Sequence, residues 1–330
     1  MKAAFITRTG PPGVIQYGEL PDPVPGPRQA LVRVRAAAVN PIDTYVRAGT
    51  VAMPLPFPFV VGCDLAGEVV AVGSEVDRLR PGMRVWGSNQ GLLGRQGTCA
   101  ELAAVDENWL YPTPDGVTDR EAAAAALVSI TAHLGLVTHA AIQPGETIFV
   151  SGGSGGVGSA VVQIAKALGG RVLATAGTPE KRQRVHEFGA DVVLDYRRED
   201  LVATVLALVP RGVDIHWETR REPDFEMAIA LLADRGRMVL MAGREARSPL
   251  PVGPFYTKGC RLIGFVMFKA GPHEQAAAAA DINRWLARGR LRAPVDRVVT
   301  LAHVAEAHAL QEAATVGGSG ELAGKIVVEP

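Results

Sequence analysis

Residues 150–166 read VSGGSGGVGSAVVQIAK, and five of the seven positions from 152 to 158 are glycine. Such a run is informative only between a strand and a helix, because linkers and disordered tracts are also rich in glycine. The preceding residues 146–150 (ETIFV) have the composition of a short buried strand. Apolar residues after the turn recur at helical spacing: Val157, Ala160, Val161, Ile164, Ala165 and Leu168. The stretch therefore predicts a strand, a tight turn and a helix in succession.

A glycine turn in this position is suited to hold a dinucleotide. Without Cβ atoms the backbone can approach a pyrophosphate, and the N–H groups at the start of the helix favour its charge. The residues predicted to bind the cofactor here are Gly152, Gly155, Gly156, Val157 and Gly158. A turn required only for tight packing is the alternative. A mononucleotide loop is disfavoured, because the run ends in Gly-Val-Gly-Ser rather than Gly-Lys-Ser/Thr.

The end of the next expected strand (171–176) indicates which dinucleotide is bound. NAD-binding units carry an Asp or Glu here for the ribose hydroxyl, whereas this chain reads Ala-Thr-Ala-Gly over 174–177. Lys181, Arg182 and Arg184 follow, and cations at this place suit a 2′-phosphate. The pattern favours NADPH, with Lys181 as the preferred ligand. Arg182 and Arg184 either bind the phosphate or face solvent.

The organisation of the chain predicts two domains, as its 330 residues also allow. The first third has many Pro and Gly residues and short alternating runs, which indicate mostly antiparallel strands. An alanine-rich helix over 119–141 follows, and then strands and helices alternate as in a parallel sheet flanked by helices. The strands expected after 171–176 are 191–195, 213–217, 237–242 and 260–266, and the helices are 178–189, 198–209, 223–234 and 274–289. We place the domain borders at 1–122 plus 268–330 and at 123–267.

The composition argues against several classes of partner. Lys plus Arg and Asp plus Glu both total 34, so no net charge attracts nucleic acid or an anionic membrane. The start of the chain does not resemble a signal peptide, and we find no apolar run of the roughly 18 to 20 residues needed to span a bilayer. Cys63, Cys99 and Cys260 are few and widely spaced, which suits a reducing compartment. A cytoplasmic protein is the expectation.

Several stretches together resemble one known family. They are AAAVNPIDTYVRAG (36–49), PFVVGCDLAGEVVAVG (58–73), SITAHLGL (129–136), the glycine run, ATAGTPEK (174–181), Tyr196 and GKIVV (324–328). In this order they resemble the medium-chain dehydrogenase/reductases of the quinone oxidoreductase, or zeta-crystallin, group over essentially the whole chain.

The resemblance implies an α/β protein in which a Rossmann doubly wound parallel sheet is inserted into a GroES-like, mainly β domain. It also implies a homodimer, with NADPH and a small-molecule substrate in the cleft between the domains. Gly177, Lys181 and Tyr196 match positions around the 2′-phosphate, and Asn40 and Thr131 match the nicotinamide end. Lys325 matches a lysine near the dinucleotide.

The residues that would bind zinc in related alcohol dehydrogenases differ in this chain. The first ligand position is Asn40, and a Gly-His-Glu segment has become Gly62-Cys63-Asp64, so we expect no metal. Without a Lewis acid the hydride acceptor should delocalise charge itself, which quinones do and conjugated enones or enoyl thioesters also do. A low-turnover NADPH-binding protein is a further alternative, since zeta-crystallins also serve as structural proteins of the lens.

Candidate catalytic residues follow from the same motif. Asn40 and Tyr45 are assigned to the catalytic site, with Tyr45 either donating a proton or only packing. Asp43 is interpreted as structural, and His133 and His139 are not preferred as bases, since an isolated helical histidine usually packs or faces solvent. A loop that reads WETRREPDF over 217–225 departs from the family pattern. Its cations either face solvent or favour an anionic substrate.

Overall fold

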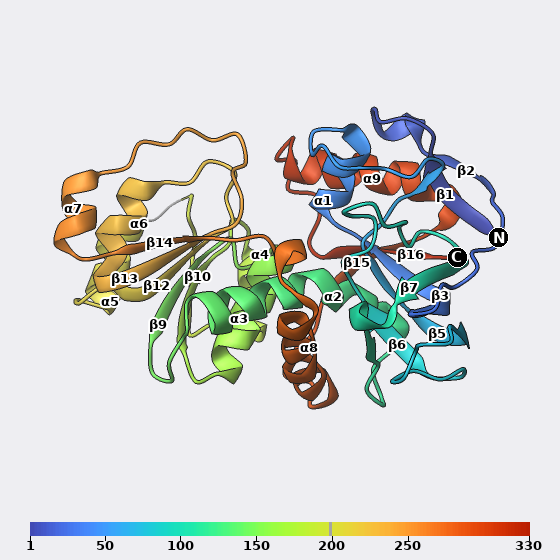
Figure 1. Ribbon diagram of the computed structural model, residues 1–330. Coiled ribbons are helices and arrows are strands. Elements are labelled where there is room, and N and C mark those ends of the chain that lie inside the picture. The colour runs from blue at the N-terminus through green and yellow to red at the C-terminus, as the bar shows by residue number, and fades with distance from the viewer. Residues whose placement is uncertain (198–199) are drawn as a thin grey trace. The chain divides into compact units, whose positions relative to one another are not determined.

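The computed structural model describes residues 1–197 and 200–330, and these divide into two compact units (Figure 1). Unit 1 contains Met1–Val128 and Gly271–Pro330, and unit 2 contains Ser129–Ala270. The expected insertion of one unit into the other is present. Its borders follow Val128 and Ala270, where the sequence suggested 122 and 267.

Unit 1 is mainly β and has two sheets. One is antiparallel with the order β2-β1-β4, and the other has the order β15-β16-β3-β5-β6-β8, with β7 paired to β3. The strands are β1 (Lys2–Ile6), β2 (Gln16–Glu19), β3 (Gln29–Val39), β4 (Phe59–Val60), β5 (Asp64–Val72), β6 (Arg84–Gly87), β7 (Leu102–Asp106), β8 (Leu110–Pro112), β15 (Val295–Thr300) and β16 (Lys325–Glu329). In β16, Val327 lies opposite Ala38 of β3, so both parts of the chain contribute to one sheet.

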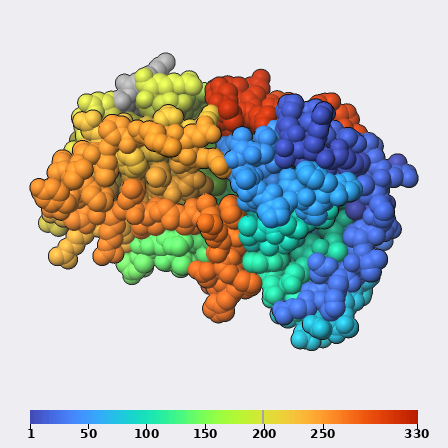
Figure 2. All heavy atoms as spheres, turned by 45° about the horizontal axis from the view of Figure 1, so that its top comes forward, coloured from blue at the N-terminus to red at the C-terminus, as the bar shows by residue number. Residues whose placement is uncertain are grey.

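The helices of unit 1 are α1 (Pro41–Ala48), α8 (Pro272–Ala287) and α9 (Val304–Thr315), and α2 (Asp119–His133) crosses the border between the units. Three short 3₁₀ turns, η1 (Pro12–Val14), η2 (Glu107–Trp109) and η5 (Leu301–His303), complete the unit. Figure 2 shows the blue N-terminal residues beside the red C-terminal residues on one face of unit 1, where η1 packs on α9.

Unit 2 has one six-stranded parallel sheet with the order β11-β10-β9-β12-β13-β14. The strands are β9 (Thr147–Ser151), β10 (Arg171–Thr175), β11 (Val192–Leu194), β12 (Val213–Glu218), β13 (Leu232–Leu240) and β14 (Arg261–Gly264). The helices are α3 (Gly156–Ala167), α4 (Pro179–Glu187), α5 (Leu201–Leu208), α6 (Phe225–Leu231) and α7 (Val252–Thr257), with a 3₁₀ turn η4 (Met267–Lys269). This strand order and the mainly β unit 1 confirm the predicted fold class.

The direction of winding reverses between β9 and β12, because the chain proceeds from β9 to β10 on one side and returns to β12 on the other. In open parallel sheets, ligands bind outside the carboxyl ends of the strands at this switch point. A ligand site in unit 2 is therefore expected at the residues that follow β9 and β12.

Two predicted helices are shorter in the structure. The helix expected over 223–234 ends at Leu231, because Leu232 already pairs with Val213 of β12 at the start of β13. The helix expected over 119–141 changes at Leu134 to a π-helix, η3 (Leu134–His139). The helix expected over 198–209 begins within residues 198 and 199, which lie outside the described residues, and α5 covers its remainder.

The expectation about apolar runs was wrong for one segment. Asp119–His139 is long and apolar enough to cross a membrane. Most of the segment is buried inside the protein, including Ala122–Ala126. A largely buried helix of this kind is typical of a protein core, which explains its apolar composition.

Candidate functional site

The glycine turn connects β9 to α3, and its glycines have different structural reasons. Gly152 has a φ of +83°, and a Cβ there would lie 2.4 Å from Thr219 Oγ1. A Cβ on Gly158 would lie 2.1 Å from the carbonyl oxygen of Gly152. At Gly155, by contrast, the nearest atom to an added Cβ is the Gly152 oxygen at 3.6 Å. The fold therefore requires glycine at 152 and 158 but would tolerate a Cβ at 155 without a steric clash.

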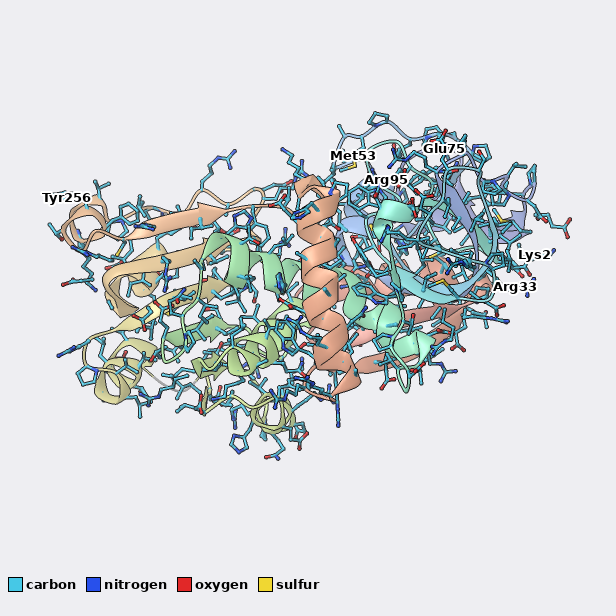
Figure 3. All side chains as sticks on the ribbon, turned by 60° about the horizontal axis from the view of Figure 1, so that its bottom comes forward. Lys2, Arg33, Met53, Glu75, Arg95 and Tyr256 are labelled. Atoms are coloured by element: carbon cyan, nitrogen blue, oxygen red, sulfur yellow. The ribbon has the colours of Figure 1, made fainter. Side chains whose placement is uncertain are left out.

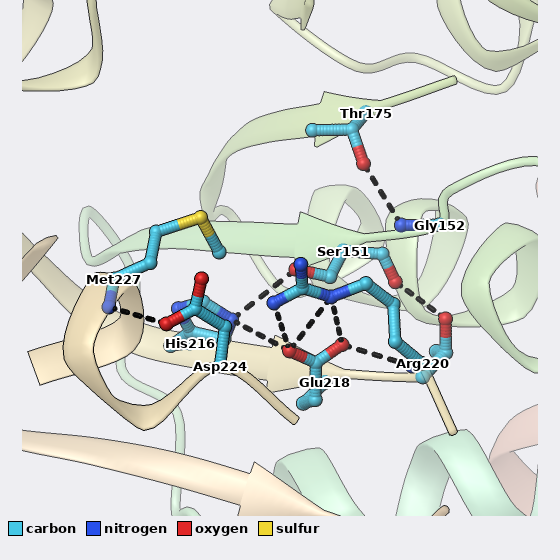
Figure 4. A network of polar contacts seen from close by, with 9 residues as sticks. Ser151, Gly152, Thr175, His216, Glu218, Arg220, Asp224 and Met227 are labelled. Carbon is cyan, nitrogen blue, oxygen red and sulfur yellow. Dashed lines mark hydrogen bonds and ion pairs between the residues drawn. The ribbon is translucent and has the colours of Figure 1, made fainter. Parts of the chain in front are cut away.

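A polar network supports this turn at the carboxyl ends of the strands (Figure 4). Gly152 N donates to Thr175 Oγ1 of β10 at 3.0 Å, and Thr219 Oγ1 donates to the carbonyl oxygen of Ser151 at 2.5 Å. Ser151 Oγ lies 3.2 Å from Nε2 of His216 on β12. These contacts fix the backbone of the turn relative to β10 and β12.

Glu218, at the end of β12, is the charged centre of the network. It is completely buried and forms hydrogen bonds with Arg220, from Nε at 3.0 and 3.1 Å and from Nη2 at 2.7 Å. Burial opposes ionisation of Glu218, but the nearby His216 and the hydrogen bonds from Arg220 outweigh it and lower its pKa to about 2. Ser151 and Glu218 both approach Nε2 of His216, so the three do not form a nucleophilic triad, which uses both ring nitrogens.

A pocket of about 210 Å³ lies beyond the end of β10. Its lining residues are Gly177, Thr178, Pro179, Arg182, Asp195 and Arg197. Arg182 Nη1 pairs with Asp195 Oδ2 at 2.6 Å, and Asp195 Oδ1 accepts a hydrogen bond from Arg197 N at 3.0 Å. The pocket thus combines two guanidinium groups with one carboxylate, and α4 begins at its edge.

The structure brings some of the predicted phosphate ligands to this pocket. Gly177 lines it, and a Cβ on Gly177 would lie 2.7 Å from Tyr196 Oη, so the Tyr196 ring covers this glycine. Lys181 is half-buried on α4 and is not among the lining residues. Sequence reasoning did not select Arg197, although it directly follows Tyr196. The two consecutive arginines after Tyr196 in the sequence could have indicated a further cation near the phosphate.

Unit 1 contains a buried cluster of charges around Lys325. Lys325 Nζ donates to the carbonyl oxygen of Val39 at 2.8 Å and to Asn40 Oδ1. Asn40 Nδ2 in turn donates to Asp64 Oδ2 at 2.8 Å, and Ser88 Oγ donates to Asp64 Oδ1 at 2.6 Å. Burial raises the pKa of Asp64 and lowers that of Lys325, while the attraction between the two groups opposes both shifts.

This donor set does not fit a zinc ion. The Asn40 amide oxygen accepts from an ammonium group, and both oxygens of Asp64 accept hydrogen bonds from Asn40 and Ser88. Burial raises the pKa of the Cys63 thiol well above its usual value, and the nearby Asp43 and Asp64 carboxylates raise it further. Within residues 1–197 and 200–330, no group of three or more His, Cys, Asp or Glu side chains could hold a metal. The cation in this cluster is Lys325.

The remaining predicted residues lie on helices. Tyr45 is half-buried on α1, and its hydroxyl makes no hydrogen bond to any residue that the structure describes. Asp43, on the same helix, accepts a hydrogen bond from Asn40 N at 2.7 Å, as its structural interpretation requires. Thr131 is buried on α2, and so is His133. The His139 ring stacks on Phe265 at 4.6 Å between centroids.

Comparison with known proteins gives the class to which this architecture belongs. Residues 26–115 match the alcohol dehydrogenase GroES-like domain, and residues 156–284 match the zinc-binding dehydrogenase family. The quinone oxidoreductase of Sus scrofa is 32% identical over 312 residues, which are 93% of each chain.

Two solved structures have the same fold over the whole chain. A crystal structure titled as an NAD-dependent alcohol dehydrogenase is 30% identical with a TM-score of 0.89, and each chain is covered completely. The Escherichia coli quinone oxidoreductase complexed with NADPH is 26% identical with a TM-score of 0.85 and the same coverage. The chain belongs to the medium-chain dehydrogenase/reductase superfamily, and within it to the quinone oxidoreductase group.

Proposed function

We propose that this protein is an NADPH-dependent oxidoreductase that reduces a quinone without a metal. The pocket beyond β10 carries the proposal, because Arg182 and Arg197 line it where an NAD-binding unit would have an Asp or Glu at the end of the strand. Its one carboxylate, Asp195, is paired with Arg182. The NADPH complex of the E. coli quinone oxidoreductase supports the same cofactor. Because one similar structure is titled as an NAD-dependent alcohol dehydrogenase, the preference between NADPH and NADH has to be measured.

The described residues fit a bound dinucleotide. The turn at Gly152, Gly155, Gly156, Val157 and Gly158 would hold the pyrophosphate at the start of α3, where backbone N–H groups favour anions. The pocket lined by Gly177, together with Tyr196 and Lys181, would hold the 2′-phosphate. We assign Asn40, Thr131 and Lys325 to the nicotinamide half. NADPH supplies a hydride when it is bound.

The side chains of unit 1 have separate roles in this proposal. Asn40 is held by Lys325 and Asp64, so its amide has a fixed orientation and contributes by positioning. Tyr45 has an uncommitted hydroxyl, which can donate a proton to the reduced oxygen of the acceptor. A quinone delocalises the added charge over its ring, and the reaction therefore needs no Lewis acid.

Tyr45→Phe tests the proton donor. We expect kcat/KM for quinone reduction to fall by about a hundredfold or more, as is usual when a general acid is lost, because only the hydroxyl is removed. Stability should hardly change, since this hydroxyl has no hydrogen bond to a described residue. Unchanged kcat/KM on every substrate that the wild type reduces would remove Tyr45 from the mechanism.

Cofactor preference is tested by Arg197→Ala and Lys181→Ala, with Gln183→Ala, an exposed residue on the same helix as Lys181, as the control. A charge-assisted contact contributes roughly 1.5 to 3 kcal/mol, so losing Arg197 should weaken NADPH binding about tenfold to a hundredfold. Lys181→Ala should act in the same direction, and NADH binding should hardly change. Dissociation constants for both cofactors are measured at one salt concentration. A wild type that prefers NADH would overturn the cofactor assignment.

Substrate class is tested by NADPH oxidation with quinones, enals, enones and enoyl thioesters, ranked by kcat/KM in the presence and absence of a chelator. Quinones should rank first, and chelation should have no effect. Enones or enoyl thioesters in first place would replace the quinone. A protein that quenches NADPH fluorescence but consumes no NADPH with any acceptor would be the low-turnover binder.

We also propose a homodimer in the cytoplasm. The three cysteines are free and buried, which suits a reducing compartment. The dimer rests on the resemblance to the quinone oxidoreductase group, and sedimentation equilibrium measures it directly.

A further inference from the structure

The loop Ser88–Gly97 follows β6, in the connection to β7, and is fixed to the Lys325 cluster. Ser88 Oγ donates to Asp64, and Gln90 N donates to the carbonyl oxygen of Cys63 at 3.2 Å. Across the loop, Gly91 N donates to the carbonyl oxygen of Gln96 at 2.9 Å. The segment is therefore held next to Asn40, which we assign to the nicotinamide half of the site.

Asn89 has an unusual environment in this loop. Its φ is +70°, in the left-handed region, which asparagine adopts more readily than most residues other than glycine. Its side chain is completely buried, and neither Nδ2 nor Oδ1 has a hydrogen-bond partner among the described residues. Buried polar groups almost always have hydrogen-bond partners, so an unpaired buried amide calls for a specific explanation.

Arg95 provides a second unsatisfied donor in the same loop. Its Nε donates to the carbonyl oxygen of Asn89 at 2.8 Å, and its guanidinium lies 5.3 Å from the centre of the Trp109 ring. Arg95 Nη2 is buried and has no partner among the described residues. Arg95 lies in unit 1, where Figure 3 labels it. This hydrogen bond holds the Arg95 guanidinium against the backbone of Asn89.

We infer that Asn89 and Arg95 form a polar subsite that receives a carbonyl oxygen of the quinone, an inference that rests on the proposed function. Nδ2 of Asn89 and Nη2 of Arg95 are both donors, so an oxygen acceptor satisfies both. A cation beside that oxygen also stabilises the negative charge that develops there during reduction. Because protein covers both groups, the oxygen is admitted when the Asn89 side chain rotates.

Asn89→Gly separates a ligand role from a structural one. Glycine tolerates the left-handed backbone and removes the unsatisfied amide, so the melting temperature should rise or stay unchanged. Loss of one hydrogen bond to the ligand should increase the quinone KM and dissociation constant by about fivefold to tenfold. The dissociation constant of NADPH should not change. Quinone binding is measured without turnover, by the concentration dependence of the melting temperature.

Leu93→Gly is the matched control, because Leu93 has a φ of +53° in the same loop and an exposed apolar side chain. It should leave the quinone dissociation constant unchanged. Arg95→Lys keeps a positive charge but loses the planar donor group, and it should also weaken quinone binding.

The outcomes distinguish this subsite from the proposed function. If the wild type reduces quinones and Asn89→Gly binds them equally well, the subsite is overturned and the proposed function stands. If Asn89→Gly weakens NADPH and quinone binding alike, the amide supports the fold and the subsite is also overturned. If the wild type neither binds nor reduces any quinone, the proposed function fails and the subsite fails with it.

Discussion

Lys325→Met is expected to lower the free energy of unfolding by about 3 to 5 kcal/mol, because it leaves buried carboxylates without their cation. Lys325 is 5% exposed, and the Asp64 carboxylate and the Asn40 amide depend on its charge and its hydrogen bond. Methionine has a similar length and fills much of the same space, so lost volume contributes little. Urea unfolding at neutral pH, followed by circular dichroism, measures the change.

Two further variants show whether the loss is electrostatic. Asp64→Asn combined with Lys325→Met removes both charges, and the double variant should lose less than the sum of the single changes. Lys166→Met breaks the Lys166–Asp191 pair, in which both side chains are about one-third exposed, and should cost about 1 kcal/mol or less. A loss for Lys325→Met as small as that for Lys166→Met would contradict the idea of a buried charge cluster.

The glycine turn could be predicted because its requirements are local. Gly152 has a positive φ, and Gly158 approaches the carbonyl oxygen of Gly152, six residues before it. The helix after them repeats its apolar residues at the expected spacing. The Lys325 cluster could not be found in this way. Its members come from positions 40, 64, 88 and 325, and no periodicity in the sequence relates these positions.

The differences from expectation arise where tertiary contacts override local preference. Leu232 follows a helical pattern in the sequence, but the neighbouring strand β12 pairs with it and ends α6 early. Arg197 was missed because its place in the pocket depends on the turn after β11, which brings Asp195 and Arg182 together. Asn89 was missed because the burial of its unpaired amide depends on tertiary packing.

Gly155→Ala and Gly158→Ala are expected to impair NADPH binding for different reasons, and the contrast tests the cofactor site. A Cβ at position 158 would lie 2.1 Å from the Gly152 carbonyl oxygen, which is a steric clash. Gly158→Ala should therefore destabilise unit 2 by about 2 to 4 kcal/mol and abolish NADPH binding. A Cβ at position 155 makes only an ordinary van der Waals contact, with the Gly152 carbonyl oxygen at 3.6 Å. Gly155→Ala should therefore keep the wild-type melting temperature.

The bound pyrophosphate is what Gly155 leaves room for, since the second glycine of such a turn permits close approach of the phosphates. Gly155→Ala should thus weaken NADPH and NADH by the same factor, about tenfold or more, because both cofactors share the pyrophosphate. Gly13→Ala is the control, because it adds a Cβ to open space far along the chain. Gly116→Ala would not be suitable, because Gly116 has a φ of +78°. Fluorescence titration gives the dissociation constants, and thermal unfolding reports the stability. If Gly155→Ala bound both cofactors as tightly as the wild type, the pyrophosphate would have to lie away from this turn, and the cofactor site would need to be placed elsewhere.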